Sequence, residues 1–284
     1  MTGKTVVVTG ASTGIGAAAA RQLHALGAEV VVVGRSPDKT AAVAREVGTE
    51  PLTADFARLS DVRRLADDLL ARCPRIDVLA NNAGGIWPQR ITTPDGHEQT
   101  FQVNHLATYL LTRLLRDRLL ASRAQVVTTS SSAHTSGRLD LDDLDGQRRR
   151  YRSVIAYGTS KVENILFTRE LARREPGLRA TSFHPGAVAT EFGRDSRLIG
   201  LLYRTALQRV MRTPDQGADT LVWLAAGHGG GGGPVADGAV ADARGADGGY
   251  FVSRRPGKVS AQGRDDELAR RLWERSAELV GLPA

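Results

Sequence analysis

Short runs of apolar, mostly β-branched residues recur along the first two thirds of the chain. Runs such as KTVVVT and EVVVV are too short for typical helices and do not alternate with polar residues. This pattern is typical of strands that are covered on both faces of a sheet. It predicts strands at Lys4–Thr9, Glu29–Val33, Glu50–Ala54, Asp77–Ala80, Ala124–Thr129 and Leu178–Phe183.

Helical patterns separate these predicted strands. A stretch of strong helix formers follows the first strand, and Ser36-Pro37 is a start signal for the next helix. Alternating strands and helices with right-handed crossovers predict a doubly wound α/β Rossmann fold, with a central parallel sheet of about seven strands and helices on both faces. The predicted helices are residues 17–26, Asp38–Val47, Ser60–Arg72, His97–Leu120 and Tyr157–Arg174.

The last part of the chain predicts a final strand in GGYFVS, near residue 250, and a closing helix at Arg264–Leu279. Between them and the preceding elements, residues 227–249 are rich in glycine and predict a flexible surface loop. No internal repeat and no clear boundary interrupts the pattern. We therefore expect residues 1–284 to form a single Rossmann-type domain.

A glycine-rich segment, TGASTGIG at Thr9–Gly16, joins the first predicted strand to the first helix. Glycines there permit a sharp turn and let a pyrophosphate approach the backbone, while the helix N-terminus favours an anion. The spacing is G-x3-G-x-G, so the strand–loop–helix context carries the prediction of nucleotide binding; a tight turn without a ligand is the alternative. The predicted contacts are Gly10, Ser12, Thr13, Gly14, Ile15 and Gly16.

The end of the second predicted strand indicates which nicotinamide cofactor is bound. NAD-binding proteins place an acidic residue there for the ribose 2′-hydroxyl, whereas this chain has Gly34-Arg35-Ser36. No carboxylate repels a 2′-phosphate, and the forked guanidinium of Arg35 is suited to bind one, with Lys39 nearby. We therefore expect NADP(H) rather than NAD(H). The alternative is that Arg35 is a solvated loop cation.

The ordered set of motifs resembles the short-chain dehydrogenase/reductase family over about residues 3–192. The chain is also similar to the retinol-dehydrogenase-like branch of this family, which extends the resemblance over nearly the whole chain. The similar features are SSSAH, the long gap before Tyr157, and the tail YFVSRR…LARRLWERSAEL. The resemblance implies an oxidoreductase that moves hydride between a nicotinamide and a carbonyl/alcohol pair. The motifs are TGASTGIG, Asp55, NNAG at Asn81–Gly84, Asn104 in FQVNHL, Ser130–Ser132, Tyr157-x-x-x-Lys161, and His184-Pro185-Gly186 with Thr190.

Carbonyl reduction also needs a proton donor that works near neutral pH. A free tyrosine has a pKa of about 10, and a nearby ammonium lowers that pKa by favouring the phenolate. Tyr157 and Lys161 are four residues apart and share one face of the predicted helix. We predict that Tyr157 donates or accepts the proton and that Lys161 supports it; the resemblance implies that Lys161 also holds the nicotinamide ribose. A packed helix aromatic is the alternative for Tyr157.

Two further catalytic roles follow from the resemblance. Ser131, the second of the three serines after the fifth strand, is assigned to orient the carbonyl, with Ser130 and Ser132 as rivals because neighbouring strand residues face opposite ways. Asn104 is assigned to a water relay towards Lys161. The alternative is a buried asparagine that only bridges backbone groups.

The resemblance implies the remaining cofactor contacts. Asp55 is expected to meet the adenine amine, or else to cap a turn. The residues after the fourth strand are expected to approach the adenosine ribose, and the Pro-Gly turn after the sixth strand is expected to bring backbone groups to the carboxamide. These contacts are Asn82, Ala83, Gly84, Pro185, Gly186, Val188 and Thr190.

Composition limits the location and partners of the protein. The chain has one cysteine, no apolar run of 18 residues and no signal-peptide pattern at its start, so we expect a cytoplasmic protein without a membrane segment. The histidines lack metal-ligand spacing, and no metal is expected. The formal net charge is +7, but no basic stripe carries interleaved aromatics, so we expect solvated arginines and no nucleic-acid partner.

The substrate is expected to be a small carbonyl compound or alcohol. Residues 191–212 are rich in apolar side chains and predict a lid over an apolar substrate, although packing against the domain gives the same composition. By analogy with the family it resembles, one expectation is a homo-oligomer that pairs through the helices beginning near His97 and Tyr157. The rival function is an NADP-binding regulator of the same fold without turnover; the set Asn104, Ser131, Tyr157 and Lys161 argues against it.

Overall fold

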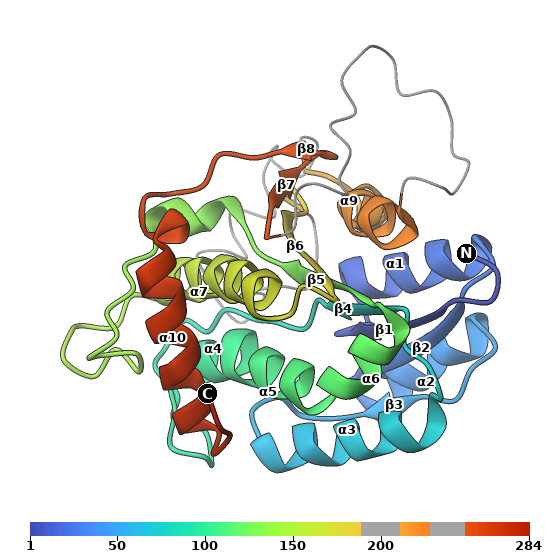
Figure 1. The fold of residues 1–284 in the computed structure, drawn as a ribbon, viewed down its shortest axis with the longest axis horizontal. Helices are drawn as coiled ribbons and strands as arrows, with labels where there is room; N and C mark the ends of the chain where they lie inside the picture. The colour runs from blue at the N-terminus through green and yellow to red at the C-terminus, as the bar shows by residue number, and fades with distance from the viewer. Residues whose placement is uncertain (189–210, 228–247) are drawn as a thin grey trace.

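The computed structural model describes residues 1–188, 211–227 and 248–284, which surround a central eight-stranded sheet (Figure 1). The strand order is β3-β2-β1-β4-β5-β6-β7-β8, and β1 to β7 pair in parallel. The strands are β1 Thr5–Thr9, β2 Glu29–Gly34, β3 Leu52–Thr53, β4 Val78–Asn81, β5 Gln125–Thr129, β6 Arg179–His184, β7 Tyr250–Val252 and β8 Arg255–Pro256. The predicted doubly wound fold is confirmed, with the reversal of strand order at β1 and β4.

Strand β8 was not predicted. It pairs antiparallel with β7 through a two-residue turn at Ser253 and Arg254, which have φ of 50° and 62°. Such hairpin turns usually carry glycine, asparagine or aspartate. The residues in this turn therefore give no sequence signal for the hairpin.

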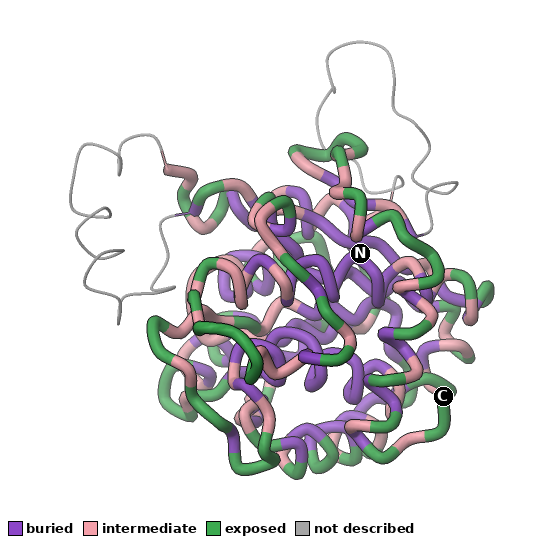
Figure 2. The backbone as a smooth tube through the Cα atoms, turned by 90° about the vertical axis from the view of Figure 1, so that its left-hand side faces the viewer, coloured by how far each residue is buried: buried purple, intermediate pink, exposed green. Residues whose placement is uncertain are grey.

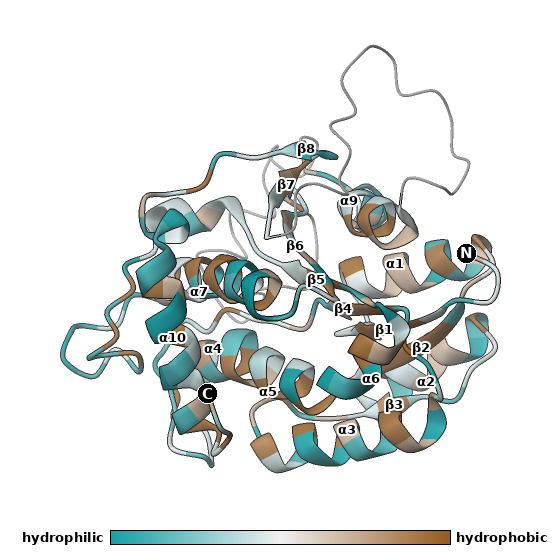
Figure 3. Cartoon of the chain, in the orientation of Figure 1, coloured by the Kyte–Doolittle hydropathy of each residue, from teal (hydrophilic) through white to brown (hydrophobic). Residues whose placement is uncertain are grey.

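Helices cover both faces of the sheet, and each face has its own apolar core. Val7 of β1 belongs to the core under α3, α5, α7 and α10, whereas Val6 and Val8 belong to the core under α1, α2 and α9. The central segments are buried and the outer helix faces are exposed and hydrophilic (Figures 2 and 3). The helices are α1 Gly14–Ala25, α2 Pro37–Glu46, α3 Leu59–Arg72, α4 Gln99–Phe101, α5 Ala107–Leu114, α6 Arg116–Ser122, α7 Ser153–Arg174, α9 Pro214–Ala226 and α10 Asp266–Leu279.

The prediction of one continuous helix at His97–Leu120 is wrong, because this range contains several helical segments. The Glu98 carboxylate accepts hydrogen bonds from the backbone N–H groups of Thr100 and Phe101, so α4 begins after it. A π-helical turn at Gln102–Leu106 then separates α4 from α5, and a break at Leu115 separates α5 from α6. The π-helical turn contains Asn104, and such turns often occur at functional sites.

Helix α9 was also missed, although the sequence carries its start signal. Thr213 and Gln216 form a capping box, in which the Thr213 hydroxyl accepts from Gln216 N at 3.2 Å and Thr213 N donates to Gln216 Oε1 at 3.0 Å. Pro214 occupies the first turn, where its missing N–H costs nothing. α9 packs against α1 on the same face of the sheet.

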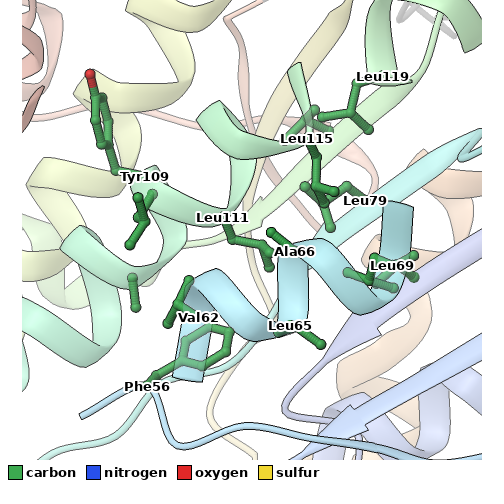
Figure 4. Packing of buried hydrophobic residues seen from close by; sticks show 14 of the residues in the cluster. Phe56, Val62, Leu65, Ala66, Leu69, Leu79, Tyr109, Leu111, Leu115 and Leu119 are labelled. Atoms are coloured by element: carbon green, nitrogen blue, oxygen red, sulfur yellow. The ribbon is translucent and has the colours of Figure 1, made fainter. Parts of the chain in front are cut away.

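Figure 4 shows the core between α3 and α5, where Val62 and Ala66 of α3 lie below Leu111. Farther along this face, the Trp273 ring of α10 stacks on Phe167 at 5.9 Å and meets Tyr109 edge-on at 5.0 Å. The closing helix thus completes the core over α5 and α7.

Two predicted segments lie outside the described residues. They are nearly all of the proposed lid, residues 191–212, and nearly all of the glycine-rich segment, residues 227–249. Among the helices in the described ranges, none combines the length and apolar character that a membrane crossing requires.

Replacing Trp273 by alanine is expected to lower the free energy of unfolding by about 3–5 kcal/mol, because it leaves a cavity among Tyr109, Phe167 and their neighbours. Urea unfolding followed by circular dichroism measures this loss. Arg271→Ala, at an exposed position of the same helix, is the control and should change it by less than about 0.5 kcal/mol. A similar small change for Trp273→Ala would show that α10 does not contribute to the core.

Candidate active site

A cleft of about 690 Å³ lies along the carboxyl ends of the parallel strands. All the predicted cofactor contacts within the described residues line it, from Gly10 in the glycine loop to Val188 after β6. Ser131 lines it too. Asn104 does not, and Thr190 lies outside the described residues. Open α/β sheets bind ligands at this edge, where the strand order reverses.

The glycine loop leaves no room for side chains. Gly10 and Gly14 have φ of +66° and +57°, which glycine adopts without strain. A Cβ on Gly10 would lie 2.7 Å from the Ala83 Cα, and a Cβ on Gly16 would lie 2.6 Å from Asn82 Nδ2. These two glycines therefore bring the start of α1 against the end of β4.

Hydrogen bonds fix this contact. The Thr9 hydroxyl accepts from the backbone N–H groups of Asn82 and Ala83 at 3.0 and 3.1 Å, and donates to Ala80 O at 3.2 Å. Asn82 Nδ2 donates to Thr9 O at 3.0 Å. The two sequence motifs TGASTGIG and NNAG thus form one connected unit at the bottom of the cleft.

The loop geometry fits a pyrophosphate. Thr13 precedes α1 but makes no capping hydrogen bond with its side chain, so the first N–H groups of the helix remain available to an anion in the cleft. Gly10 and Gly16 both line the cleft, and without a Cβ they allow a ligand there to approach the backbone closely.

Three polar side chains line the cleft beyond β2, namely Arg35, Ser36 and Lys39. Arg35 is exposed, and Asp55 is the only acidic residue among the described residues that line the cleft. Asp55 lies after β3, and its Oδ1 accepts from Ala57 N at 3.0 Å. Asp55 therefore caps a turn, as one of the two expectations had it, and still lines the cleft.

The three serines after β5 have different surroundings. Ser130 is buried and its hydroxyl donates to Lys161 O at 2.9 Å, away from the cleft. Ser132 is exposed and does not line the cleft. Ser131 lines the cleft, and its Oγ accepts from Ala133 N at 3.2 Å. Its hydroxyl proton is left for a group in the cleft, which favours Ser131 over its rivals.

Tyr157 and Lys161 come together on the cleft face of α7. Lys161 Nζ lies 5.3 Å from the Tyr157 ring centroid and donates to Thr129 O at 3.1 Å. The Lys161 side chain is almost fully buried, and this loss of water lowers its pKa to about 8. A cation at this position favours the phenolate form of Tyr157.

Asn104 lies behind the cleft and is fully buried. Its Oδ1 accepts from Gly85 N at 2.8 Å, and its Nδ2 donates to Gly85 O at 3.0 Å and to Ser160 Oγ at 2.9 Å. Asn104 thus bridges backbone groups, as the alternative expectation described, and holds the cleft wall at Gly85 against α7. Its part in a water relay stays a prediction.

The segment after Ser131 packs tightly against α7 next to Tyr157. A Cβ on Gly158 would lie 2.6 Å from Ala133 O, and a Cβ on Gly137 would lie 2.5 Å from Gly158 O. Only glycines permit this approach, so Gly137 and Gly158 set the spacing between the segment that carries Ser131 and the helix that carries Tyr157.

The sequence did not lead us to expect an apolar group of cleft residues that includes Trp87. The Trp87 ring lies over Gly85, where a Cβ would be 2.5 Å from it. The position of Gly85, Ile86 and Trp87 directly after NNAG was a usable signal, whereas Val103 had none. The missed apolar residues include Phe56, Ile86, Trp87, Val103 and Ala187, whereas Met211, which also lines the cleft, belongs to the predicted lid 191–212.

In residues 1–188, 211–227 and 248–284, no three side chains of the kinds His, Cys, Asp or Glu gather closely enough to hold an ion.

Comparisons with known proteins agree with this geometry. The model of the family described as short chain dehydrogenase matches residues 4–198, more than half of the chain. A Streptomyces sp. (strain C5) protein provisionally assigned as a daunorubicin C-13 ketoreductase is 47% identical over 285 residues, which cover 98% of this chain and 93% of that protein. Human retinol dehydrogenase 13 is 37% identical over 297 residues, covering 99% and 86%.

Two solved structures are also similar. An uncharacterised protein from Mycobacterium paratuberculosis has a TM-score of 0.76 and 32% identity, covering 99% of this chain and 95% of that one. A protein from Beutenbergia cavernae, described as an NAD(P)-dependent gluconate 5-dehydrogenase with NADP bound at low occupancy, has a TM-score of 0.63 and 29% identity, covering 79% and 90%.

Replacing Lys161 by methionine is expected to stabilise the protein without ligand at pH 7. The pKa of Lys161 is about 8 in the folded protein, below its ordinary 10.5, so the folded state binds fewer protons than the unfolded chain between these values. Its buried ammonium therefore costs on the order of 3 kcal/mol at pH 7, and this cost disappears as the pH rises through that window. In the variant the Thr129 carbonyl loses its hydrogen bond from Lys161 Nζ but still accepts from Asn164 Nδ2, which lies at 3.1 Å.

Urea unfolding at pH 7 and at pH 10 measures this effect. Lys258→Met, at an exposed position, is the control and should show neither a gain nor a pH dependence. A Lys161→Met gain that is as large at pH 10 as at pH 7 would contradict a cost that arises from the buried charge.

Proposed function

This chain belongs to the short-chain dehydrogenase/reductase family, and we propose that it is an NADP(H)-dependent oxidoreductase that interconverts an apolar ketone or aldehyde and its alcohol. The observation that carries the proposal is the presence of Ser131, Tyr157 and Lys161 in one cleft with the glycine loop and Arg35. A proton donor, a buried cation and an anion-binding helix start thereby face a shared space.

The chain supplies the proton chemistry and the orientation. When bound, NADPH supplies a hydride to the carbonyl carbon. The Ser131 hydroxyl donates a hydrogen bond to the carbonyl oxygen, and Tyr157 transfers its phenolic proton to that oxygen as the C=O π bond becomes a C–O single bond. The Lys161 ammonium stabilises the resulting phenolate. Alcohol oxidation runs through the same groups in reverse.

The proposed preference for NADP(H) rests on charge. Arg35 and Lys39 line the cleft beyond β2, and the nearest acidic lining residue, Asp55, has one carboxylate oxygen engaged by Ala57 N. A 2′-phosphate there meets two cations and a hydroxyl. The NADP bound to the Beutenbergia cavernae protein supports this choice by similarity.

The proposed apolar substrate rests on the cleft residues Ile86, Trp87, Ala187 and Met211. Apolar and aromatic side chains with few polar groups are typical of small-molecule sites. The name of the Streptomyces relative, a ketoreductase, supports a ketone as the oxidised partner. A panel of apolar and aromatic ketones, aldehydes and alcohols, assayed by NADPH absorbance in both directions, tests the proposal, and no turnover with any compound would refute it.

Tyr157→Phe is expected to reduce kcat by about 10²–10⁴-fold or more, because it removes the transferred proton but not the ring. NADPH binding, measured by fluorescence titration, should stay within about twofold of wild type. Tyr109→Phe removes a phenolic hydroxyl from a buried residue that does not line the cleft, and it is the control. Turnover near the wild-type rate in Tyr157→Phe would assign the proton to another group.

Arg35→Glu is expected to raise the KM for NADPH at least tenfold, a loss of about 1.4 kcal/mol or more, and to leave the KM for NADH within about threefold. A carboxylate at this position repels a 2′-phosphate and tolerates a 2′-hydroxyl. Arg45→Glu makes the same charge change at an exposed position outside the cleft and is the control. An equal loss for both cofactors would show that Arg35 does not contact the phosphate.

A further inference from the structure

A segment near the C-terminus reaches back to the catalytic serine. The C-terminal strap, which we define as Gly257–Arg264, connects β8 to α10 and lies outside the residues that match the family model. Gln262 fixes it to the segment that follows Ser131: Leu139 N donates to Gln262 Oε1 at 3.1 Å, and Gln262 Nε2 donates to Leu139 O at 2.9 Å. The strap thus adjoins the turn Ser132–Ser136.

His134, in that turn, connects the strap to Ser131. Its side chain is almost fully buried, and both ring nitrogens have partners. Ser260 N donates to His134 Nε2 at 3.2 Å, and His134 Nδ1 lies 2.7 Å from Ser131 O. A backbone N–H can only donate, so Nε2 carries no proton. The ring proton is therefore on Nδ1 and is donated to the Ser131 carbonyl.

Tyr250 of β7 and the strap both contact the His134 ring. His134 meets the Tyr250 ring edge-to-face at 5.0 Å and 68°. Gly257 of the strap packs on the same tyrosine, where a Cβ would lie 2.8 Å from the ring. β7 and the strap thus form a slot that holds the imidazole with Nδ1 towards Ser131.

These contacts determine the geometry of Ser131. Its carbonyl accepts from His134 N at 3.1 Å as well as from Nδ1, and its Oγ accepts from Ala133 N. The backbone of Ser131 is extended, with φ of −162° and ψ of 157°. Two donors on one carbonyl fix the peptide plane, and with it the direction in which Oγ enters the cleft.

We propose that His134, held by the strap through Ser260, is a positioning residue that fixes Ser131 for its hydrogen bond to the substrate oxygen. The proposal rests on the proposed oxidoreductase function. It makes the C-terminal strap part of the support of the catalytic serine. Rate losses of about a hundredfold follow from displacements near 1 Å in catalytic geometry, so a partial release of Ser131 should have a measurable effect on kcat.

A double-mutant cycle tests the proposal. His134→Phe keeps the ring in its slot and removes both hydrogen bonds, and we expect it to lower kcat about tenfold while the KM for NADPH changes less than about twofold. In a Ser131→Ala background the same substitution should lower kcat by less than about twofold, because the group it positions is gone. An equal loss in both backgrounds would overturn the proposal.

Two further variants separate positioning from general damage to the turn. His134→Asn places an amide N–H near the position of Nδ1, and we expect it to recover kcat to within about threefold of wild type. Thr135→Val removes the bond from the Thr135 hydroxyl to Ser132 O, in the same turn but on the neighbouring carbonyl, and should leave kcat unchanged. A loss in Thr135→Val as large as in His134→Phe would contradict the proposal.

A measurement without turnover distinguishes failure of this proposal from failure of the proposed function. Nitrogen-15 NMR of the histidine rings, assigned by the signal absent from His134→Asn, should show His134 protonated on Nδ1 and unprotonated on Nε2. The opposite tautomer would overturn the positioning role even in an active enzyme. Absence of turnover with every carbonyl compound would refute the proposed function. The tautomer would still show whether His134 Nδ1 donates to the Ser131 carbonyl.

Discussion

The contact between two glycines of the first loop and the end of β4 is the constraint on which the cleft depends. Gly10 and Gly16 lie so close to Asn82 and Ala83 that a Cβ at either position would clash. The Thr9 hydroxyl and the Asn82 amide then fix the loop to the strand. Because β1 and β4 are neighbours in the sheet, this contact places the start of α1 beside the strands that lead to the proposed catalytic residues.

A second layer of contacts supports the buried cation. The Thr129 carbonyl accepts from Lys161 Nζ and from Asn164 Nδ2, and the Ser130 hydroxyl binds the Lys161 carbonyl. The end of β5 therefore holds the lysine from both its side chain and its backbone. Burying an ammonium with one carbonyl partner opposes stability, and the same burial strengthens its electrostatic effect on Tyr157. Stability and the proposed catalytic role therefore make opposite demands on Lys161.

The sequence was sufficient where structure depends on local pattern, as in the β-branched strands, the glycine loop and the spacing of Tyr157 and Lys161. It failed where conformation depends on distant partners. The π-helical turn at Asn104 accompanies its pairing with the backbone of Gly85, and β8 requires positive φ at Ser253 and Arg254. The orientation of Trp87 depends on packing over Gly85, which no periodicity reports. Helix α9 was missed for a different reason: its capping box at Thr213 and Gln216 is a local signal that was present in the sequence.

The docking of α10 has a consequence for how copies of this chain meet. Pairing through the helices that begin near His97 and Tyr157 was one expectation, but Trp273 of α10 already lies on Tyr109 and Phe167 of α5 and α7. The outer side of α10 carries ion pairs of Arg270 with Glu267 and Glu274, and of Arg275 with Glu278. Helix α10 therefore covers part of the apolar surface of α5 and α7, and a partner approaching from that side would meet charged side chains. Pairing of two copies stays a prediction.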